Sequence, residues 1–355
     1  MLPSSLIATR KPLPRSRTRA SMMTRRVAVV GGGIAGVACA TELAQSGVPV
    51  RILDRGHRLG GRLATQTLRG TGTPFDGRVV DVGASYFTAH DPGFLEVVEG
   101  LIDRGVARRW TDTFHVADPR GVIGPKLGPL RYAAPRGLRS IVEDLAGLLP
   151  QDLVEIRHPV DVPSIRRDAD RLIIEDEEYA AIAICVPDPQ ALTLLADDSV
   201  ADVRQLLEDG PAWEPVMALT AVFDDECWDP FDGVFVNDEA VLTFIANDGR
   251  RRGDDAPVLV AHSTATLAAG HLIEPLGAAP AMLASLGSVL KTTGDPSWFT
   301  VKRWTYARPL SARPESFGLV GAIGLAGDAW ADGPRTEAAW RSGHELGQRL
   351  AAGIR

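Results

Sequence analysis

A short apolar strand that runs into a glycine-rich turn is the feature that most constrains the fold of this chain. Residues Val27–Val30 predict a buried strand, and Gly31, Gly33 and Gly36 follow it in the spacing GxGxxG. The first glycine allows a tight turn, the second lets a phosphate approach the backbone, and the third lets a helix pack closely on the sheet. The helix predicted from Val37 onward begins with free N–H groups and a positive dipole end. The pattern therefore predicts a Rossmann-type unit that binds a dinucleotide.

An acidic residue and an arginine extend this fingerprint. Asp54 ends the second predicted strand, 18 residues after Gly36, where a carboxylate can accept hydrogen bonds from ribose hydroxyls. Gly60, Gly61 and Arg62 then follow, and they are not part of a minimal NAD site. They resemble the second fingerprint of FAD enzymes of the amine oxidase superfamily, in which the arginine meets the pyrophosphate. Arg62 can make a bidentate, charge-assisted contact there, so the sequence favours FAD over NAD.

The composition is that of an ordinary globular protein, with 355 residues, 45% hydrophobic and 23% charged. No apolar run reaches the ~18 residues of a membrane-spanning helix, so we expect no membrane partner. Cys39, Cys185 and Cys227 are widely spaced and fit no disulfide framework, which favours a reducing, cytoplasmic compartment. Neither HExxH nor CxxC occurs, and we expect no metal.

The charges are distributed unevenly along the chain. Residues 1–26 contain seven Lys or Arg and no acidic residue, which leaves 31 basic and 45 acidic residues in 27–355. The acidic body argues against a nucleic-acid partner. The basic segment has the Arg- and Ser-rich composition of an organellar transit peptide, but a disordered N-terminal extension is the plainer interpretation. The oligomeric state stays open.

The order of predicted elements indicates a nucleotide-binding domain that is interrupted by a second domain. Apolar runs such as Ala181–Val186 predict strands covered on both faces, whereas Ala218–Phe223 and Val258–His262 predict strands of a mostly antiparallel sheet. We expect an α/β fold in which a Rossmann-type FAD-binding domain carries an inserted substrate domain. The predicted FAD-binding domain comprises 27–95, 150–205 and 313–355, and the predicted substrate domain comprises 96–149 and 206–312.

Several separated motifs have a family likeness in kind and order. They are Asp81–Pro92, Ala134–Leu138, Val186–Ala191, Arg303–Ala307, Gly327–Trp330 and Arg335–Ala339. Together they resemble the renalases and their bacterial relatives. The resemblance implies the two-domain fold of amine oxidases and p-hydroxybenzoate hydroxylase, with noncovalently bound FAD. It also implies a small-molecule substrate, a dihydropyridine isomer of NAD(P)H, which passes a hydride to the flavin and leaves as NAD(P)+.

The fingerprint and the resemblance together predict the residues that hold FAD. In flavoproteins of this group the aspartate of the C-terminal Gly-Asp pair holds ribityl or pyrophosphate oxygens, and the next helix points its positive end at the flavin N1/O2 edge. The predicted cofactor-binding residues are Gly31, Gly33, Ile34, Ala35, Gly36, Asp54, Arg55, Gly61, Arg62, Gly83, Ala84, Gly327, Asp328, Glu337 and Ala338.

Three side chains are candidates for the catalytic site. Tyr86 can stack on a pyridine substrate or be a core tyrosine. His262 can hydrogen-bond a substrate carboxamide or a flavin edge, or make a plain polar contact at the end of a strand. Trp304, with Tyr306, can line the cavity or fill the core of the inserted domain. Arg250–Arg252 can anchor a substrate phosphate, although a charge run of this kind more often indicates a solvated loop.

Rival functions remain open at this point. A flavin amine oxidase often places a lysine near flavin N5, and the comparable strand Pro215–Phe223 has none. A desaturase or protoporphyrinogen-oxidase-like enzyme would need an apolar insertion for membrane docking, which this sequence lacks. A flavin-binding protein without turnover is a third alternative. Relatives often have Gln where this chain has Ser85 and Glu where it has Asp54, so polar contacts near the cofactor can differ.

Overall fold

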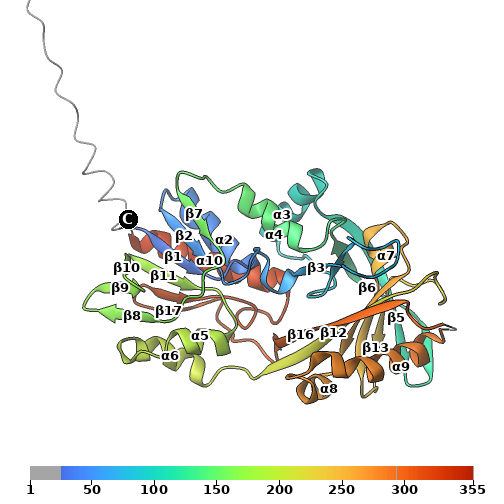
Figure 1. The fold of residues 1–355 in the computed structure, drawn as a ribbon. Coiled ribbons are helices and arrows are strands. Elements are labelled where there is room, and N and C mark those ends of the chain that lie inside the picture. Colours follow the sequence, from blue (N-terminus) through green and yellow to red (C-terminus); the bar gives the residue numbers. More distant parts are fainter. Residues whose placement is uncertain (1–24, 293, 355) are drawn as a thin grey trace, which may run out of the picture.

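The computed structural model describes residues 25–292 and 294–354 (Figure 1). The predicted N-terminal extension therefore lies outside the described residues, apart from Arg25 and Arg26. Two sheets at opposite ends of the molecule organise the rest (Figure 1). Among the described residues, no helix combines the length and apolar character needed to cross a membrane.

The first sheet is built from strands far apart in the sequence. Within the described residues it has six strands in the order β17-β18-β11-β1-β2-β7. Pairing is parallel from β18 to β7, and β17 joins antiparallel at the edge. The strands are β1 (Val27–Val30), β2 (Val50–Leu53), β7 (Val154–Arg157), β11 (Ala181–Ile184), β17 (Gly318–Val320) and β18 (Ile323–Leu325).

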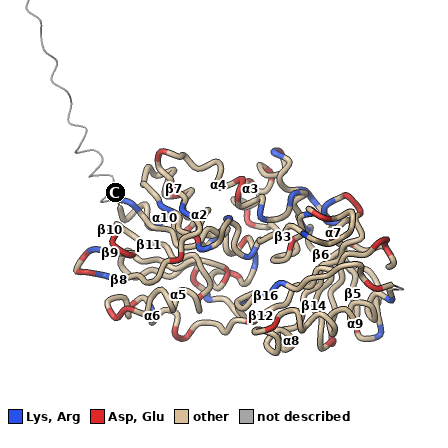
Figure 2. The backbone as a smooth tube through the Cα atoms, in the orientation of Figure 1, with Lys and Arg blue, Asp and Glu red and all other residues tan. Residues whose placement is uncertain are grey.

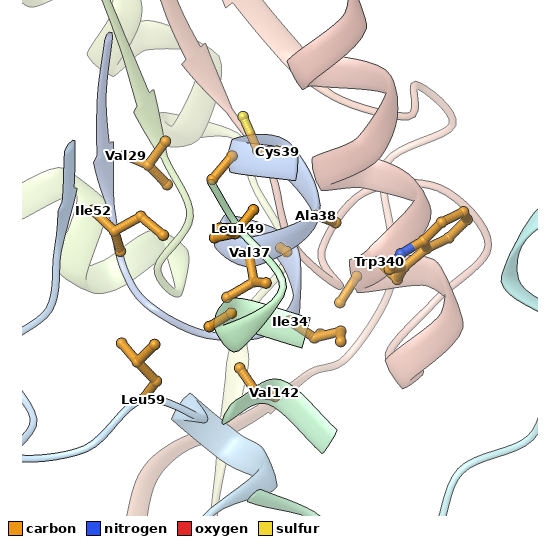
Figure 3. Close-up of a cluster of buried hydrophobic side chains, with 14 of the residues drawn as sticks. Val29, Ile34, Val37, Ala38, Cys39, Ile52, Leu59, Val142, Leu149 and Trp340 are labelled. Carbon is orange, nitrogen blue, oxygen red and sulfur yellow. The ribbon is translucent and has the colours of Figure 1, made fainter. Parts of the chain in front are cut away.

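Alternation along these strands sends side chains to two separate cores. Val27 and Val29 face one core, formed with α2 (Ile34–Gln45) and α10 (Thr336–Ile354), which Figure 3 shows in close-up. Ala28 and Val30 face the other, under α5 (Asp188–Leu194), η2 (Asp198–Val200) and α6 (Ala201–Glu208). A small antiparallel sheet also covers this second core, with strands β8 (Ile165–Asp168), β9 (Arg171–Ile174) and β10 (Glu177–Tyr179).

Two glycines allow the long C-terminal helix to pack directly against α2. A Cβ atom at Gly343 would lie 2.0 Å from the carbonyl oxygen of Ala35, and one at Gly347 would lie 2.6 Å from that of Cys39. Neither position can take a side chain without moving one helix away from the other. The close contact places the start of α10 near the start of α2, at the carboxyl ends of the parallel strands.

One predicted domain boundary is wrong. The sequence predicts that residues 96–149 belong to the substrate domain, yet they include most of α3 (Pro92–Asp103) and all of α4 (Arg139–Gly147). Apolar side chains of both helices, among them Val98 and Ile141, are buried in the core beside α2. The amphipathic pattern of each helix is matched by that nearby apolar surface, so both pack with the first sheet.

The second sheet has seven strands within the described residues, in the order β16-β12-β15-β14-β13-β5-β6. All neighbours are antiparallel except β13 and β5. The strands are β5 (Arg108–Asp118), β6 (Gly121–Ala133), β12 (Trp213–Val222), β13 (Gly233–Val236), β14 (Leu242–Asn247), β15 (Val258–Ser263) and β16 (Trp298–Pro309). The predicted mostly antiparallel sheet is confirmed.

The two faces of this second sheet have different neighbours. One face carries residues such as Leu219 and Ala261, which pack under α8 (Ala265–Gly270), η3 (Pro275–Ala278) and α9 (Ala279–Leu290). Ala218 and Val260 project to the opposite face, where they contact β4 (Val79–Asp81) and the segment after it. A short ribbon of β3 (Thr65–Thr67) and β4, with η1 (Gly61–Leu63) before it, thus connects the first sheet's glycine-rich segments to the second sheet.

Candidate functional site

The turn after β1 requires glycine at two of the predicted positions. Gly31 has a φ of +107°, and a Cβ there would lie 2.5 Å from the carbonyl oxygen of Cys185 in the neighbouring strand. A Cβ at Gly36 would lie only 1.9 Å from the carbonyl oxygen of Gly31. The turn is therefore compact, and α2 begins directly against the end of β1, as the sequence predicts for a phosphate-binding turn.

The first turn of α2 presents backbone donors. Its N-cap residue is Gly33, and no side chain caps the helix. The nearest atom to a Cβ placed at Gly33 would be the Cα of Gly61, 4.0 Å away, so the approach to the backbone is bounded only by another glycine. The N–H groups here, including those of Ile34 and Ala35, can bind an anion together with the helix dipole.

Asp54 holds the two loops beside this helix start. Its carboxylate accepts hydrogen bonds from the N–H of Gly32 at 2.6 Å and from the N–H of Gly56 at 2.7 Å. Each carboxylate oxygen has two lone-pair sites, so acceptor capacity remains for ribose hydroxyls. The neighbouring Arg55 is exposed and its side chain makes no hydrogen bond within the described residues.

Arg62 and Asp328 form a bidentate ion pair although they lie 266 residues apart in the sequence. Arg62 Nη1 donates to Oδ2 at 2.8 Å and Nη2 donates to Oδ1 at 2.6 Å, while Nη1 also donates to the carbonyl of Ala307 at 3.2 Å. A guanidinium has five N–H donors, so the Nε–H and one Nη2–H remain for a phosphate. Gly327, just before the aspartate, donates its N–H to Ser342 of α10 at 3.0 Å.

The backbone after β4 lies directly on that of Arg62. Ala84 donates its N–H to the carbonyl of Arg62 at 2.9 Å, and Gly83 donates to the carbonyl of Ala64 at 3.2 Å. A Cβ at Gly83 would lie 2.0 Å from the Arg62 carbonyl oxygen, so only glycine fits there. The predicted cofactor residues of the two fingerprints and of the Gly83–Ala84 segment are thus in one continuous row.

Trp304 ties the second sheet to this row. Its indole Nε1 donates to the carbonyl of Val82 at 2.6 Å, and its ring packs beside Val80 and Ala218. The side chain therefore positions the segment that leads into Gly83, and it also fills the interface between the sheets. Tyr306 lies two residues further along β16 and is half-buried.

His262 lies near the end of β15, beside the same segment. Burial and the charge of Arg251 together lower the pKa of His262 to about 4, and a hydrogen bond to the Gly83 backbone opposes the shift. Its Nε2 atom is buried and has no hydrogen-bond partner among the described residues. His262 is therefore a neutral imidazole near pH 7, and its buried ring nitrogen can hydrogen-bond a ligand.

Tyr86 lies close to His262 through a shared aromatic neighbour. The ring centroids of Tyr86 and Phe244 are 5.9 Å apart, and those of Phe244 and His262 are 6.2 Å apart. Burial raises the pKa of Tyr86, against the opposing charge of Arg131. The three predicted catalytic side chains thus converge on Val82–Tyr86, and the phenol stays protonated at working pH.

The prediction of a solvated loop at Arg250–Arg252 is wrong. These residues form part of the short helix α7 (Asp248–Arg252), and Arg251 and Arg252 are buried. Both pair with Asp248, and Arg252 Nη2 also lies 3.0 Å from Asp81 Oδ2. Figure 2 shows basic and acidic residues side by side around α7. The alternative substrate-phosphate role is also unsupported, because the two buried guanidinium groups are already paired with carboxylates.

The network has a direct consequence for the site. Arg251 Nη1 donates to the carbonyl of Ser85 at 3.0 Å, so α7 fixes the backbone next to Tyr86. Asp81 also accepts the N–H of Leu138 at 2.7 Å. Sequence reasoning missed Asp81 and Asp248 as site-supporting residues, since a carboxylate in a strand or loop gives no local sign of a distant arginine partner.

Glu337 is placed differently from the prediction. Its carboxylate accepts the N–H groups of His90 and Asp91, both at 2.5 Å, so it anchors the start of α3 rather than facing the row of cofactor residues. Only its backbone N–H, with that of the buried Ala338, remains for a cofactor at the start of α10. The sequence predicts a cofactor contact at Glu337 because this residue lies at the start of a helix and shortly after the Gly327–Asp328 pair.

Sequence reasoning also missed Arg131, which lies on β6 against Tyr86 and Phe114. Arg131 is buried, as are Tyr132 and Ala133 after it. The one signal was a charged residue that opens an apolar run at the end of a strand, which is a weak indication by itself.

Comparison with known proteins supports the fold. Residues 29–102 match the family described as NAD(P)-binding Rossmann-like domain. The carotenoid phi-ring synthase of Streptomyces griseus is 53% identical over 53 residues, which is 15% of this chain and 10% of that protein. The shared segment is thus a small part of either protein.

Solved structures match nearly the whole chain at low sequence identity. A protein from Exiguobacterium sp. 255-15, provisionally named a protoporphyrinogen oxidase, has a TM-score of 0.72 at 17% identity, covering 93% of this chain and 99% of its own. The fold is of the amine oxidase type. Cyclohexylamine oxidase from Brevibacterium oxydans IH-35A has a TM-score of 0.69 at 15% identity (93% and 98% covered). Wild-type putrescine oxidase bound to putrescine has a TM-score of 0.64 at 16% identity, and the match covers 93% of this chain and 99% of that protein.

Proposed function

We propose that this chain is an FAD-dependent oxidoreductase. The observation that carries the proposal is the continuous row that runs from the start of α2, through Arg62 and Gly83, to His262. Backbone donors, a ribose-binding carboxylate and an arginine with two spare N–H groups occur there in the order that a dinucleotide requires. Beyond them lie neutral, buried aromatic groups, which suit a flavin ring and an uncharged reacting centre.

Each part of the row has a task in this proposal. The N–H groups of Gly33 and the first turn of α2 bind phosphate, and Asp54 accepts hydrogen bonds from ribose. Arg62 binds phosphate through its spare donors, while its pair with Asp328 keeps the guanidinium in place. The backbone at Gly83 and Ala84 flanks the ring system. When bound, FAD supplies the acceptor for a hydride from the substrate.

The surroundings of His262 and Tyr86 fit hydride transfer better than acid–base chemistry. His262 is neutral at working pH and Tyr86 stays protonated, so neither changes charge during turnover. Their roles are to orient a flat substrate and to exclude water. We propose dihydropyridine isomers of NAD(P)H as substrates and NAD(P)+ as the product, in line with the family resemblance.

Anaerobic mixing tests this proposal. The FAD-loaded protein is mixed with the 2- and 6-dihydro isomers of NAD(P), and flavin absorbance is followed in time. We expect rapid bleaching and formation of NAD(P)+. The His262→Ala variant should keep its FAD and be reduced more slowly, which unchanged kinetics would contradict. Failure of every isomer to bleach the flavin would refute the proposed substrate class.

An amine oxidase is the second candidate, because the fold matches the cyclohexylamine and putrescine oxidases over 93% of this chain. The two amines serve as probes in the same anaerobic experiment. Bleaching by either amine, with no response to the dihydropyridines, would favour this candidate. The opposite result would leave hydride transfer from a dihydropyridine as the function.

A further inference from the structure

Arg131 is a buried cation with an unusual environment. Arg131 lies near the C-terminal end of β6, a strand that Figure 1 shows beside α7, and the residue is 5% exposed. The guanidinium carbon lies 3.9 Å from the ring centroid of Phe114 and 5.6 Å from that of Tyr86. Its Nη1 donates to the carbonyl of Pro129 at 3.1 Å, and it forms no ion pair with any described Asp or Glu.

The other buried arginines among the described residues, Arg51, Arg251 and Arg252, are paired with carboxylates. Arg51 lies 2.8 Å from Glu155, and Arg252 lies 3.0 Å from Asp81. Burying a guanidinium away from water is costly unless an opposite charge and hydrogen bonds compensate it. Aromatic faces offset a part of that cost for Arg131, but they supply no negative charge. The environment of Arg131 therefore matches a binding site for an anion better than a structural contact.

Further polar atoms near Arg131 also have no partner. Within residues 25–292 and 294–354, the buried Nε of Arg131 and Nε1 of Trp110 have no hydrogen-bond acceptor. Both side chains contact the ring of Phe114, which lies 5.2 Å from the ring of Trp110 between centroids. Ser85 Oγ and His262 Nε2 are likewise unpartnered, on the side toward the row of cofactor residues. Arg131 Nε, Trp110 Nε1 and Ser85 Oγ can each donate a hydrogen bond, whereas Nε2 of the neutral His262 is left as an acceptor when the other ring nitrogen donates to Gly83. The donors beside Arg131 suit an acceptor-rich ligand.

We propose that Arg131 and Trp110 bind an oxyanion of the substrate, a carboxylate or a phosphate. The inference rests on the proposed function, since it places the reacting ring of the substrate at His262 and its anionic group at Arg131. Tyr86 and Phe244 lie between these two ends and offer aromatic surface to a flat molecule. The positive charge of Arg131 disfavours binding of a cationic amine beside it.

Direct binding tests the anion site without turnover. Inorganic phosphate and benzoate are titrated separately into the FAD-loaded protein by calorimetry, which distinguishes a phosphate site from a carboxylate site. We expect one of the two to bind, and Arg131→Met to weaken it roughly tenfold or more, since it removes charge-assisted hydrogen bonds. Trp110→Phe keeps the ring but loses the donor, and should weaken binding less.

A matched control lies on the same hairpin. Arg120 is paired with Asp118 and its side chain is 87% exposed, so Arg120→Met should bind the probes as the unmodified protein does. Circular dichroism shows whether each variant folds. If Arg131→Met does not fold, Arg131→Lys replaces it, because a lysine keeps the charge but not the planar fork, and anion affinity should fall with the fold intact.

Substrate discrimination gives a second readout. Dihydronicotinamide mononucleotide and dihydronicotinamide riboside differ by one phosphate. A phosphate site at Arg131 predicts a lower KM for the mononucleotide than for the riboside, and Arg131→Met should abolish this difference. Binding of neither probe, or equal binding to the protein and Arg131→Met, would overturn the anion site. If benzoate or phosphate binds through Arg131 while no dihydropyridine bleaches the flavin, the proposed substrate fails and the anion site stands.

Discussion

Replacing Asp248 by asparagine tests the buried charge network that supports the candidate site. The Asp248 carboxylate accepts hydrogen bonds from Arg78 Nη2 and Arg252 Nε, both at 2.9 Å, and from Arg251. Burial alone would raise the pKa of Asp248, but the charges of Arg252, Arg251 and Arg78 hold that pKa well below its usual range. Asp248→Asn keeps the side-chain shape and removes the charge. Arg251 and Arg252 are then left with Asp81 as their one buried carboxylate among the described residues, and Arg78 is left with the exposed Asp254.

The expected loss is large because the network lies away from water. Removing one partner of a buried ion pair costs about 3–5 kcal/mol. Asp248 has no exposed side-chain surface, and neither has Arg251, so solvent cannot replace the lost charge. We therefore expect the free energy of unfolding to fall by about 4 kcal/mol. Since Arg251 also fixes the carbonyl of Ser85, reduction of bound FAD should slow in the protein that remains folded.

Urea unfolding followed by circular dichroism measures this effect. Asp118→Asn is the control, because Asp118 pairs with the exposed Arg120 and solvent screens that pair, so its loss should change the free energy of unfolding far less. A loss below about 1 kcal/mol in Asp248→Asn would refute the reasoning, since surface pairs have that strength. An equal loss of unfolding free energy in Asp248→Asn and Asp118→Asn would also refute the reasoning.

Three further predictions concern the contact between α10 and α2, the pKa of His262, and the carboxylate of Asp54, which is proposed to bind ribose. Gly343→Ala places a Cβ 2.0 Å from a carbonyl oxygen of α2 and should lower the free energy of unfolding, followed by thermal unfolding, by about 1–3 kcal/mol. Gly353→Ala is the control, because it lies at an open position of α10 and should raise the free energy of unfolding slightly. The pKa of His262 is about 4 in the fold and near 6.5 when unfolded, so the unfolded state binds more protons and stability falls as pH drops through this range. When the free energy of unfolding is plotted against pH, the slope for the unmodified protein should exceed the slope for His262→Phe by up to about 1.4 kcal/mol per pH unit. Parallel curves for the two proteins would count against a buried neutral imidazole. Asp54→Ala frees two backbone N–H donors and should weaken FAD binding by at least about tenfold in a fluorescence titration, while the exposed Asp176→Ala should leave it unchanged.

Local patterns were sufficient to predict the glycine-rich turn between β1 and α2. The conformations of Gly31 and Gly36 follow from contacts within one strand–turn–helix unit, and the spacing of the glycines reports them directly. Asp54 lies at the end of the adjacent parallel strand, so its position follows from the same unit. The choice of Tyr86 and His262 as candidate site residues came instead from the family resemblance.

Long-range pairing could not be predicted in the same way. The run Arg250–Arg252 has the composition of a solvated loop, and its burial depends on Asp81, which lies 171 residues away from Arg252. Arg131 gains its aromatic surroundings from β5 and from Tyr86, which only the folded sheet brings together. The boundary error at α3 has the same origin, because an amphipathic helix does not show which of two cores will cover it.

Calorimetric titration of the protein with FAD, riboflavin and NAD+ tests the central claim most directly. The row from α2 through Arg62 to Gly83 predicts one FAD per chain. Riboflavin, which lacks the pyrophosphate and adenosine, should bind at least about a hundredfold more weakly, because it cannot use the phosphate and ribose contacts. NAD+ should not displace FAD. Equal affinity for riboflavin and FAD, or preferential binding of NAD+, would contradict the account.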